Sequence, residues 1–239
     1  SLAAVAHFCG PGRIMKITVI NPNTTRSMTK KIADAARAAA RSDTEIVATQ
    51  PDRGPASIQG YHDIALCLPG LLETAALHNT SDALVVACFD DTGVDALRCQ
   101  FDGPVIGIGE AAFHAASLIS CQFSVITTLA RSVPNLRDNL NRYGLSARCS
   151  GIRASGVPVL DIEADQKGAE DLISNEVQKA IADDGADAIV LGCAGMADLN
   201  HRLATRFGLP VIDGVSCAVS LAEALVSIGL RTSKMGGYA

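Results

Sequence analysis

Short apolar runs alternate along the chain with longer stretches in which apolar positions recur at helical spacing. The short runs are rich in Val and Ile and hold few polar residues, which is typical of strands covered on both faces. The predicted strands are 16–21, 45–49, 83–87, 105–108, 123–127, 151–154, 188–191 and 211–212. The predicted helices are 26–41, 58–77, 109–120, 133–143, 164–183, 197–207 and 216–228. This alternation predicts an α/β fold with mainly parallel sheets.

The strand pattern occurs twice. Residues 81–88 (SDALVVAC) parallel residues 186–193 (ADAIVLGC) at a shift of 193 − 88 = 105 positions. Two further pairs of segments match at a shift of 106, which are 103–107 with 209–213 and 19–21 with 125–127. A repeat of this length has the size of one small α/β domain and is too long for a solenoid unit.

We therefore expect two similar Rossmann-like lobes related by a pseudo-two-fold axis. The first lobe comprises 15–109 together with a C-terminal helical part, 216–239, that crosses back onto it, and the second comprises 110–215. Residues 1–14 are interpreted as an N-terminal extension ahead of a native start at Met15. Since ligands of open α/β sheets bind beyond the carboxyl ends of the strands, the active site is expected in the cleft between the lobes.

Composition and charge narrow the classes of partner. The chain has 20 basic and 25 acidic residues, a net charge of −5, which argues against nucleic acid as a partner. No apolar run reaches the ~18–20 residues of a membrane span, so no membrane partner is expected. The eight cysteines are scattered without a CxxC pair, as is typical of the reducing cytoplasm. The five histidines lack zinc-ligand spacing, so no metal is expected.

Two cysteines differ from the rest because they occupy equivalent positions in the two halves. Cys88 and Cys193 each follow a strand directly and each precede a loop. In a pseudo-two-fold arrangement their sulfurs would approach one ligand from opposite sides, where one could remove a proton and the other deliver one. Buried cysteine usually acts as a small hydrophobe, and we interpret the cysteines without a counterpart in this way.

Other polar residues also follow the predicted strands. Asn21 and Asn23 follow the first strand, and Thr127 and Thr128 follow its counterpart in the second half. Such side chains cap helices, and they also offer amide and hydroxyl groups to a polar or anionic ligand, so both interpretations stay open. The same two interpretations apply to a serine before a helix and to acids near strand ends, which are Ser57, Asp90, Asp91, Glu110 and Asp213.

Cofactor motifs are incomplete or missing. The chain has no GxxxxGK[ST] loop, and its Gly107–Gly109 turn lacks the third glycine of a dinucleotide-binding fingerprint. The sequence therefore gives no support for nucleotide hydrolysis or a nicotinamide cofactor.

Seven segments are specific in combination. They are VINPNTT at 19–25, PASIQG at 55–60, ACFDDTG at 87–93, PVIGIGEAA at 104–112, FSVITTLARSVP at 123–134, IVLGCAGM at 189–196 and PVIDGVS at 210–216. Together they closely resemble the hydantoin and allantoin racemases of the aspartate/glutamate racemase superfamily. The chain departs from the family pattern at Thr92, where Pro is usual, and at Gln59, where Glu is usual; we expect neither residue to touch the thiols.

The resemblance implies a two-lobed fold and a cofactor-independent racemase in which Cys88 and Cys193 are the two acid/base groups. The implied substrate is a 5-substituted hydantoin, with allantoin from purine breakdown slightly favoured over amino-acid hydantoins. Removal of its C5 proton gives an enolate-like ion that N–H or hydroxyl donors would stabilise. The expected substrate-binding residues are Asn23, Ser57, Ile58, Phe89, Thr127, Thr128, Ala194 and Gly195, with Asn21, Asp90, Glu110 and Asp213 in supporting positions.

Two alternatives remain at this stage. Within the superfamily, an aspartate- or glutamate-type amino-acid racemase, a decarboxylase or an isomerase would use the same scaffold. Outside enzymes, a small-molecule binding module with two hinged lobes fits the same alternation. The apolar helices also lead us to expect a homo-oligomer.

Overall fold

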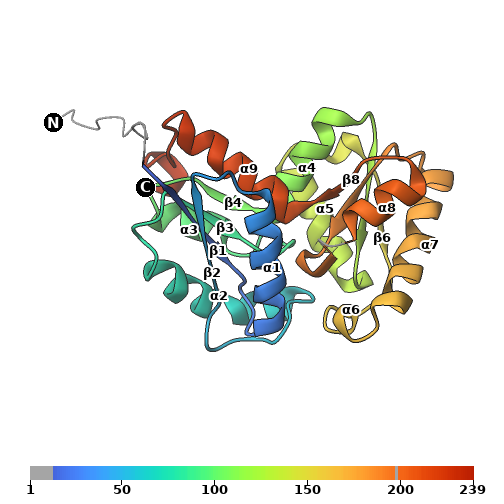
Figure 1. The fold of residues 1–239 in the computed structure, drawn as a ribbon, viewed down its shortest axis with the longest axis horizontal. Coiled ribbons are helices and arrows are strands. Elements are labelled where there is room, and N and C mark those ends of the chain that lie inside the picture. Colours follow the sequence, from blue (N-terminus) through green and yellow to red (C-terminus); the bar gives the residue numbers. More distant parts are fainter. Residues whose placement is uncertain (1–12, 197–198) are drawn as a thin grey trace.

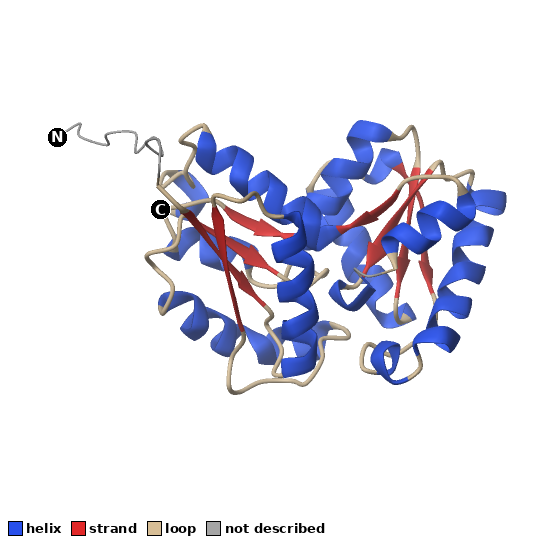
Figure 2. Cartoon of the chain, in the orientation of Figure 1, coloured by secondary structure: helices blue, strands red, loops and turns tan. Residues whose placement is uncertain are grey.

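The computed structural model describes residues 13–196 and 199–239, so residues 1–12 of the predicted extension lie outside the described part. Two four-stranded parallel sheets form the centres of two lobes, and Figure 2 shows helices against both sheets. The strands of the first sheet are β1 (Met15–Ile20), β2 (Thr44–Thr49), β3 (Ala83–Val86) and β4 (Val105–Gly107). The strands of the second sheet are β5 (Phe123–Thr127), β6 (Cys149–Ala154), β7 (Ala188–Gly192) and β8 (Val211–Asp213). The predicted α/β fold with two lobes is confirmed.

The helices connect these strands in the order that a parallel sheet requires. They are α1 (Arg26–Ala39), α2 (Tyr61–Ala76), α3 (Val94–Gln100), α4 (Ile108–Ile119), α5 (Val133–Arg142), α6 (Asp161–Ala164), α7 (Gln166–Asp184), α8 (Asn200–Phe207) and α9 (Gly214–Ser227). Within the described residues, no helix combines the length and apolarity that crossing a membrane requires.

The internal repeat reappears as matching topology. The strand orders are β2-β1-β3-β4 and β6-β5-β7-β8, so each strand has a counterpart at the same place in the other sheet. Individual hydrogen bonds repeat as well: Asp82 accepts from the backbone N–H of Lys16 at 2.8 Å, and Asp187 accepts from that of Gln122 at 2.9 Å. The sequence repeat therefore reflects a repeated set of physical contacts.

Three predicted helices need correction. The helix predicted at 58–77 begins at Tyr61, because Gly60 has φ +126° and the chain before it is a loop. The helix predicted at 164–183 is divided into α6 and α7 at Asp165, whose carboxylate accepts from the N–H of Gly168. The helix predicted at 197–207 begins at Asn200, with 197 and 198 outside the described residues, and α3 was not predicted at all.

Two helices join the lobes by crossing between them. Helix α4 follows β4 of the first sheet and contacts β7 of the second, whereas α9 follows β8 of the second sheet and contacts β3 and α1 of the first. Figure 1 shows α9 running back over the first lobe and α4 lying in the second. Our division of the chain at 109/110 and 215/216 stays a proposal about folding units, and it falls in the first turn of each of these two helices.

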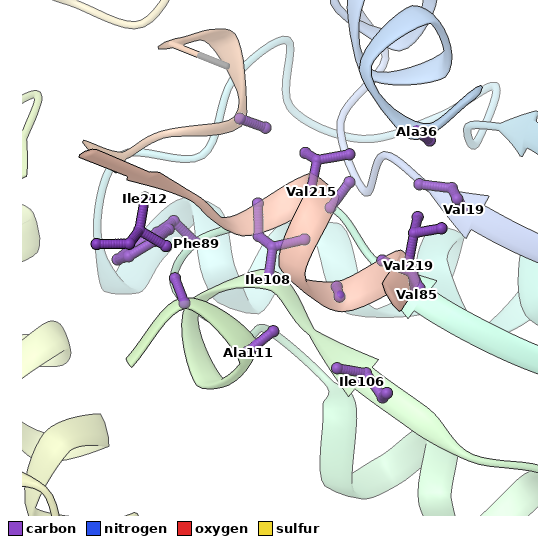
Figure 3. Close-up of a cluster of buried hydrophobic side chains, with 14 of the residues drawn as sticks. Val19, Ala36, Val85, Phe89, Ile106, Ile108, Ala111, Ile212, Val215 and Val219 are labelled. Atoms are coloured by element: carbon purple, nitrogen blue, oxygen red, sulfur yellow. The ribbon is translucent and has the colours of Figure 1, made fainter. Parts of the chain in front are cut away.

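The hydrophobic core is continuous through this crossing. Figure 3 shows Val219 of α9 near Val19 and Val85 of the first sheet, and these three side chains are fully buried. The same cluster contains Val190 of the second sheet. Because one core supports both sheets, the crossing helices fix how the strand ends of the two lobes face each other.

The starts of α4 and α9 lie in close contact, so we expect a larger residue at Gly214 to destabilise the fold. A Cβ at Gly214 would lie 2.3 Å from the carbonyl oxygen of Ile108, so Gly214→Ala forces the two helix starts apart. We expect it to lower the free energy of unfolding by about 1–3 kcal/mol, a fall in Tm of about 2–12 °C. Gly237→Ala, whose Cβ meets nothing within 4 Å, is the matched control and should change Tm by less than about 2 °C. Equal melting temperatures for both variants would contradict this account.

Candidate active site

The site lies at the carboxyl ends of the central strands of both sheets. In each sheet the second strand in chain order pairs on one side of the first strand, and the third strand pairs on its other side. The connections therefore diverge at the carboxyl end of the first strand, which makes a crevice there. The loops after β1 and β3 meet this crevice in the first lobe, and the loops after β5 and β7 meet it in the second. The two crevices contribute to one pocket between the lobes.

The pocket contains both equivalent cysteines. Its lining residues are Asn23, Met28, Ile58, Ala87, Cys88, Phe89, Asp90, Thr127, Thr128, Ser132, Val159, Gly192, Cys193 and Ala194. Both thiols are free and partly exposed to the pocket. The repeat in the sequence thus brings two sulfurs, one from each lobe, to the same cavity.

Most of the predicted substrate-binding residues line this pocket, but five predicted residues do not. The side chains brought to it include Asn23, Ile58, Phe89, Thr127, Thr128, Asp90 and the residue Ala194. Those outside the lining are Ser57, Gly195, Asn21, Glu110 and Asp213. Asp213 caps α9 by accepting from the N–H groups of Val215 and Ser216, and Glu110 pairs with Arg98 at 2.7 Å, so both carboxylates are engaged elsewhere.

Asn21 and Ser57 support the pocket from behind. The Asn21 amide donates to Asn23 Oδ1 at 2.9 Å, and the same oxygen accepts from the N–H of Thr25 at 2.9 Å. The carbonyl oxygen of Asn23 is therefore occupied, and its amide donates to the sulfur of Met28 at 3.1 Å; both residues line the pocket. Ser57 accepts from the side-chain amide of Gln59 at 2.8 Å, which braces the loop that carries Ile58.

A hydrogen bond between the lobes lies beside the pocket. The Gln59 side-chain oxygen accepts from the backbone N–H of Val159 at 3.4 Å, which joins the loop before α2 to the segment before α6. The cavity measures about 40 Å³. This hydrogen bond between Gln59 and Val159 joins the two lobes directly at the pocket.

The second lobe holds the loop that follows Cys88. Asn139 on α5 donates to the carbonyl of Asp90 at 2.9 Å. Asp91 accepts from the backbone N–H groups of Gly109 and Glu110 at 2.9 and 2.7 Å and from the Tyr143 hydroxyl at 2.8 Å. Asp91 adopts φ +52°, an uncommon backbone conformation that these contacts maintain. The loop beside Cys88 is thus fixed by residues of both lobes.

Burial controls the ionisation of the groups in the pocket. It raises the pKa of Cys193 to about 11 and that of Cys88 well above its ordinary value, and the negative charge of Asp90 acts in the same direction on both thiols. The positive charge of Lys31 on α1 partly opposes this for Cys193. Burial also raises the pKa of Asp90 to about 6 and that of Asp91 to about 7. Both thiols are therefore protonated in most molecules near neutral pH.

Sequence reasoning missed five lining residues, which are Met28, Ala87, Ser132, Val159 and Gly192. Ala87 and Gly192 directly precede the two cysteines, so their backbone could have been predicted to line the pocket. Met28 lies in the first turn of α1 and Ser132 follows the Thr127–Thr128 loop, which are positions near a strand end. Val159 comes from an irregular segment, and no sequence pattern marks it.

Few groups in the pocket suit a metal or a charged cofactor. Throughout the described ranges 13–196 and 199–239, no three His, Cys, Asp or Glu side chains gather in a way that could hold a metal ion. Among the pocket-lining residues that the structure describes, the one charged side chain is Asp90. The pocket offers two thiols, one carboxyl group and several neutral hydrogen-bonding groups. These groups can transfer protons and bind a polar ligand.

Comparison with known proteins now gives the family. The model of the Asp/Glu/Hydantoin racemase family matches residues 17–222. This chain belongs to that family. A hydantoin racemase from Rhizobium meliloti is 48% identical to it over 94% of this chain and 94% of the relative.

Solved structures of the family agree with the fold. The allantoin racemase from Klebsiella pneumoniae superposes with a TM-score of 0.91 at 43% identity, covering 94% of this chain and 93% of that chain. The allantoin racemase from Pseudomonas fluorescens gives 0.92 at 41% identity, covering 94% and 96%. The prediction of an enzyme of the racemase class is confirmed by these relatives. Glutamate racemases and an arylmalonate decarboxylase share the fold at 15–20% identity, a likeness that shows the fold alone.

Proposed function

We propose that this protein racemises a 5-substituted hydantoin without a cofactor, exchanging the C5 proton between Cys88 and Cys193. The observation that carries the proposal is the presence of both thiols, equivalent by the internal repeat, in one pocket. The names of its close relatives support the substrate class.

The pocket groups supply the steps of the reaction. One sulfur, as thiolate, takes the C5 proton and becomes a thiol, while the carbon becomes an enolate-like ion conjugated with the ring carbonyl. The Asn23 amide and the hydroxyls of Thr127 and Thr128 are the donors that stabilise the developing charge. The opposite thiol then protonates C5 on its other face and becomes the thiolate. Each turnover therefore exchanges the roles of the two sulfurs, and the protein is ready for the other enantiomer.

The charge of the pocket favours a hydantoin over an amino acid. An aspartate or glutamate substrate carries carboxylates, which usually bind to Arg or Lys. Among the described lining residues there is no Lys, Arg or His, and Asp90 would repel a carboxylate. A hydantoin is a neutral ring with N–H donors, and Asp90 can accept from one of them. This difference also disfavours the decarboxylase and isomerase alternatives, whose substrates are carboxylates.

Allantoin remains our favoured member of the class. The polar groups of Asn23, Thr128 and Ser132 fit its ureido substituent, whereas Met28 and Ile58 fit an alkyl side chain. A role in purine breakdown follows if allantoin is the better substrate. The cytoplasmic location inferred from the scattered cysteines also stays a proposal.

Replacing either pocket cysteine tests the proposal. We expect Cys88→Ser and Cys193→Ser each to lower the racemisation rate by at least about 10³-fold, because a serine hydroxyl is far too weak an acid and base at neutral pH. Cys149→Ser and Cys217→Ser, which replace half-buried thiols outside the pocket, are matched controls and should keep most of the activity. Loss of optical rotation from each enantiomer of allantoin and of a 5-alkyl hydantoin is the measurement, with circular dichroism confirming the fold. Near-normal turnover by both pocket variants would refute the proposal, and ligand binding without turnover by the unmodified protein would favour a binding module.

The raised thiol pKa values predict a steep pH dependence. The active free enzyme holds one pocket sulfur as thiolate, and that form increases with pH until the lower thiol pKa is reached. Since the pKa of Cys193 is about 11 and that of Cys88 is well above its ordinary value, kcat/KM should rise about tenfold per pH unit between pH 6.5 and 8.5. Initial rates of racemisation at constant ionic strength measure this. A flat profile across that range would show that the thiols do not limit the reaction.

We also propose that the protein is a homo-oligomer. The end of α4 exposes Leu118 and Ile119, with 82% and 59% of their surface open, and such neighbouring apolar side chains are common in subunit interfaces. Light scattering after gel filtration should give a multiple of 24.7 kDa, and Leu118→Glu should shift it toward 24.7 kDa. A mass of 24.7 kDa for the unmodified protein would contradict this proposal.

A further inference from the structure

The hydroxyl of Thr92 contacts the sulfur of Cys88. Thr92 Oγ1 lies 3.7 Å from Cys88 Sγ, and the Thr92 side chain is only 3% exposed. Within the part of the chain that the structure describes, this hydroxyl has no other hydrogen-bond partner. Either atom can donate while Cys88 is a thiol, but a thiolate carries no proton, so in the thiolate form the hydroxyl is the donor. The sequence-based expectation that Thr92 does not touch the thiols is therefore wrong.

The backbone holds Thr92 in this place. The preceding residue, Asp91, is anchored to the start of α4 and to the Tyr143 hydroxyl through its carboxylate. Together with the left-handed conformation of Asp91, these bonds turn the chain so that the side chain at 92 faces back toward Cys88. The contact thus belongs to a constrained loop.

The two halves of the pocket differ at this point. In both halves the backbone two residues further along lowers the pKa of the thiol, Asp90 for Cys88 and Gly195 for Cys193. The residue that corresponds to Thr92 at the repeat shift of 105 is Ala197, which has no hydroxyl, and its placement lies outside the described residues. The side-chain donor is therefore present at Cys88 without a counterpart at the repeat position in the second half.

We propose that Thr92 is a positioning residue that stabilises the thiolate form of Cys88 by donating its hydroxyl proton to the sulfur. This inference rests on the proposed proton exchange by two cysteines. Burial and Asp90 suppress the ionisation of Cys88, and the hydroxyl offsets part of that suppression. A racemase needs both thiolate states within reach, since each one serves one enantiomer.

The charged and titratable groups around Cys88 are few. Asp90 lies in the same loop, Cys67 approaches from α2, and both act against ionisation of Cys88. Cys193 lies across the pocket, and Lys31 on α1 acts on Cys193. Replacing Thr92 by Val alters none of these groups, so a changed reactivity of Cys88 reports on the hydroxyl.

Site-resolved alkylation tests the proposal with Cys193 as an internal control. Initial rates of iodoacetamide modification are measured from pH 7 to 9 for Cys88 and Cys193 in the same full-length protein, by mass spectrometry of their peptides. Losing the hydrogen bond should raise the pKa of Cys88 by about one unit in Thr92→Val. That change lowers the thiolate fraction about tenfold and raises its nucleophilicity about threefold, so modification of Cys88 at pH 8 should slow about threefold. The Cys193 rate should stay unchanged, and Thr92→Ser should retain the unmodified Cys88 rate.

Three results would overturn the proposal. The first is an unchanged Cys88 rate in Thr92→Val. The second is an equal slowing of Cys193, which indicates an effect on the whole pocket. The third is a Thr92→Ser variant that folds yet behaves like Thr92→Val. Racemisation rates of the same proteins separate this inference from the proposed function. Slower Cys88 modification in a protein that racemises no hydantoin refutes the function and not the contact. Normal racemisation by the unmodified protein, with Cys88 unaffected in Thr92→Val, refutes the inference alone.

Discussion

The rest of the structure depends on one constraint, which is that the carboxyl ends of the central strands of the two lobes face each other across one pocket. A single α/β lobe can place a cysteine on only one side of a ligand, whereas inversion at a carbon atom needs proton-transfer groups on both sides. The crossing of α4 and α9 supplies this geometry, because each helix leaves the last strand of its own sheet and packs on the other lobe. A common core then packs against the strands that precede the two cysteines.

Enclosure of the thiols has opposite effects on their chemistry. Burial and the charge of Asp90 make each thiolate scarce, which lowers the fraction of protein ready to react. In the proposed reaction, the same enclosure makes each thiolate a stronger base toward the weakly acidic C5–H of a hydantoin. Asn139, Tyr143 and the Asp91 carboxylate hold the loop beside Cys88 in place.

The sequence predicted the parts of this architecture that periodicity and repetition determine. The apolar strand runs gave all eight observed strands, and the 105-residue repeat selected Cys88 and Cys193 from eight cysteines. It did not predict what long-range contacts decide. Asp213 and Glu110 are carboxylates near strand ends, as site residues often are. In the structure Asp213 caps α9, and Glu110 pairs with Arg98. Val159 lines the pocket and Thr92 contacts the sulfur of Cys88. Both are placed by loop conformations, which the sequence pattern at single positions does not predict.

The most direct test of the central claim follows the C5 hydrogen of one pure enantiomer in D₂O at low conversion. If two opposed thiols exchange the proton, the inverted product carries deuterium from the solvent-equilibrated donor, while the unreacted enantiomer still carries protium. Mass spectrometry of chromatographically separated enantiomers measures both. Deuterium entering the unreacted enantiomer as fast as the product, or product that retains the original hydrogen, would indicate a single base and contradict the account.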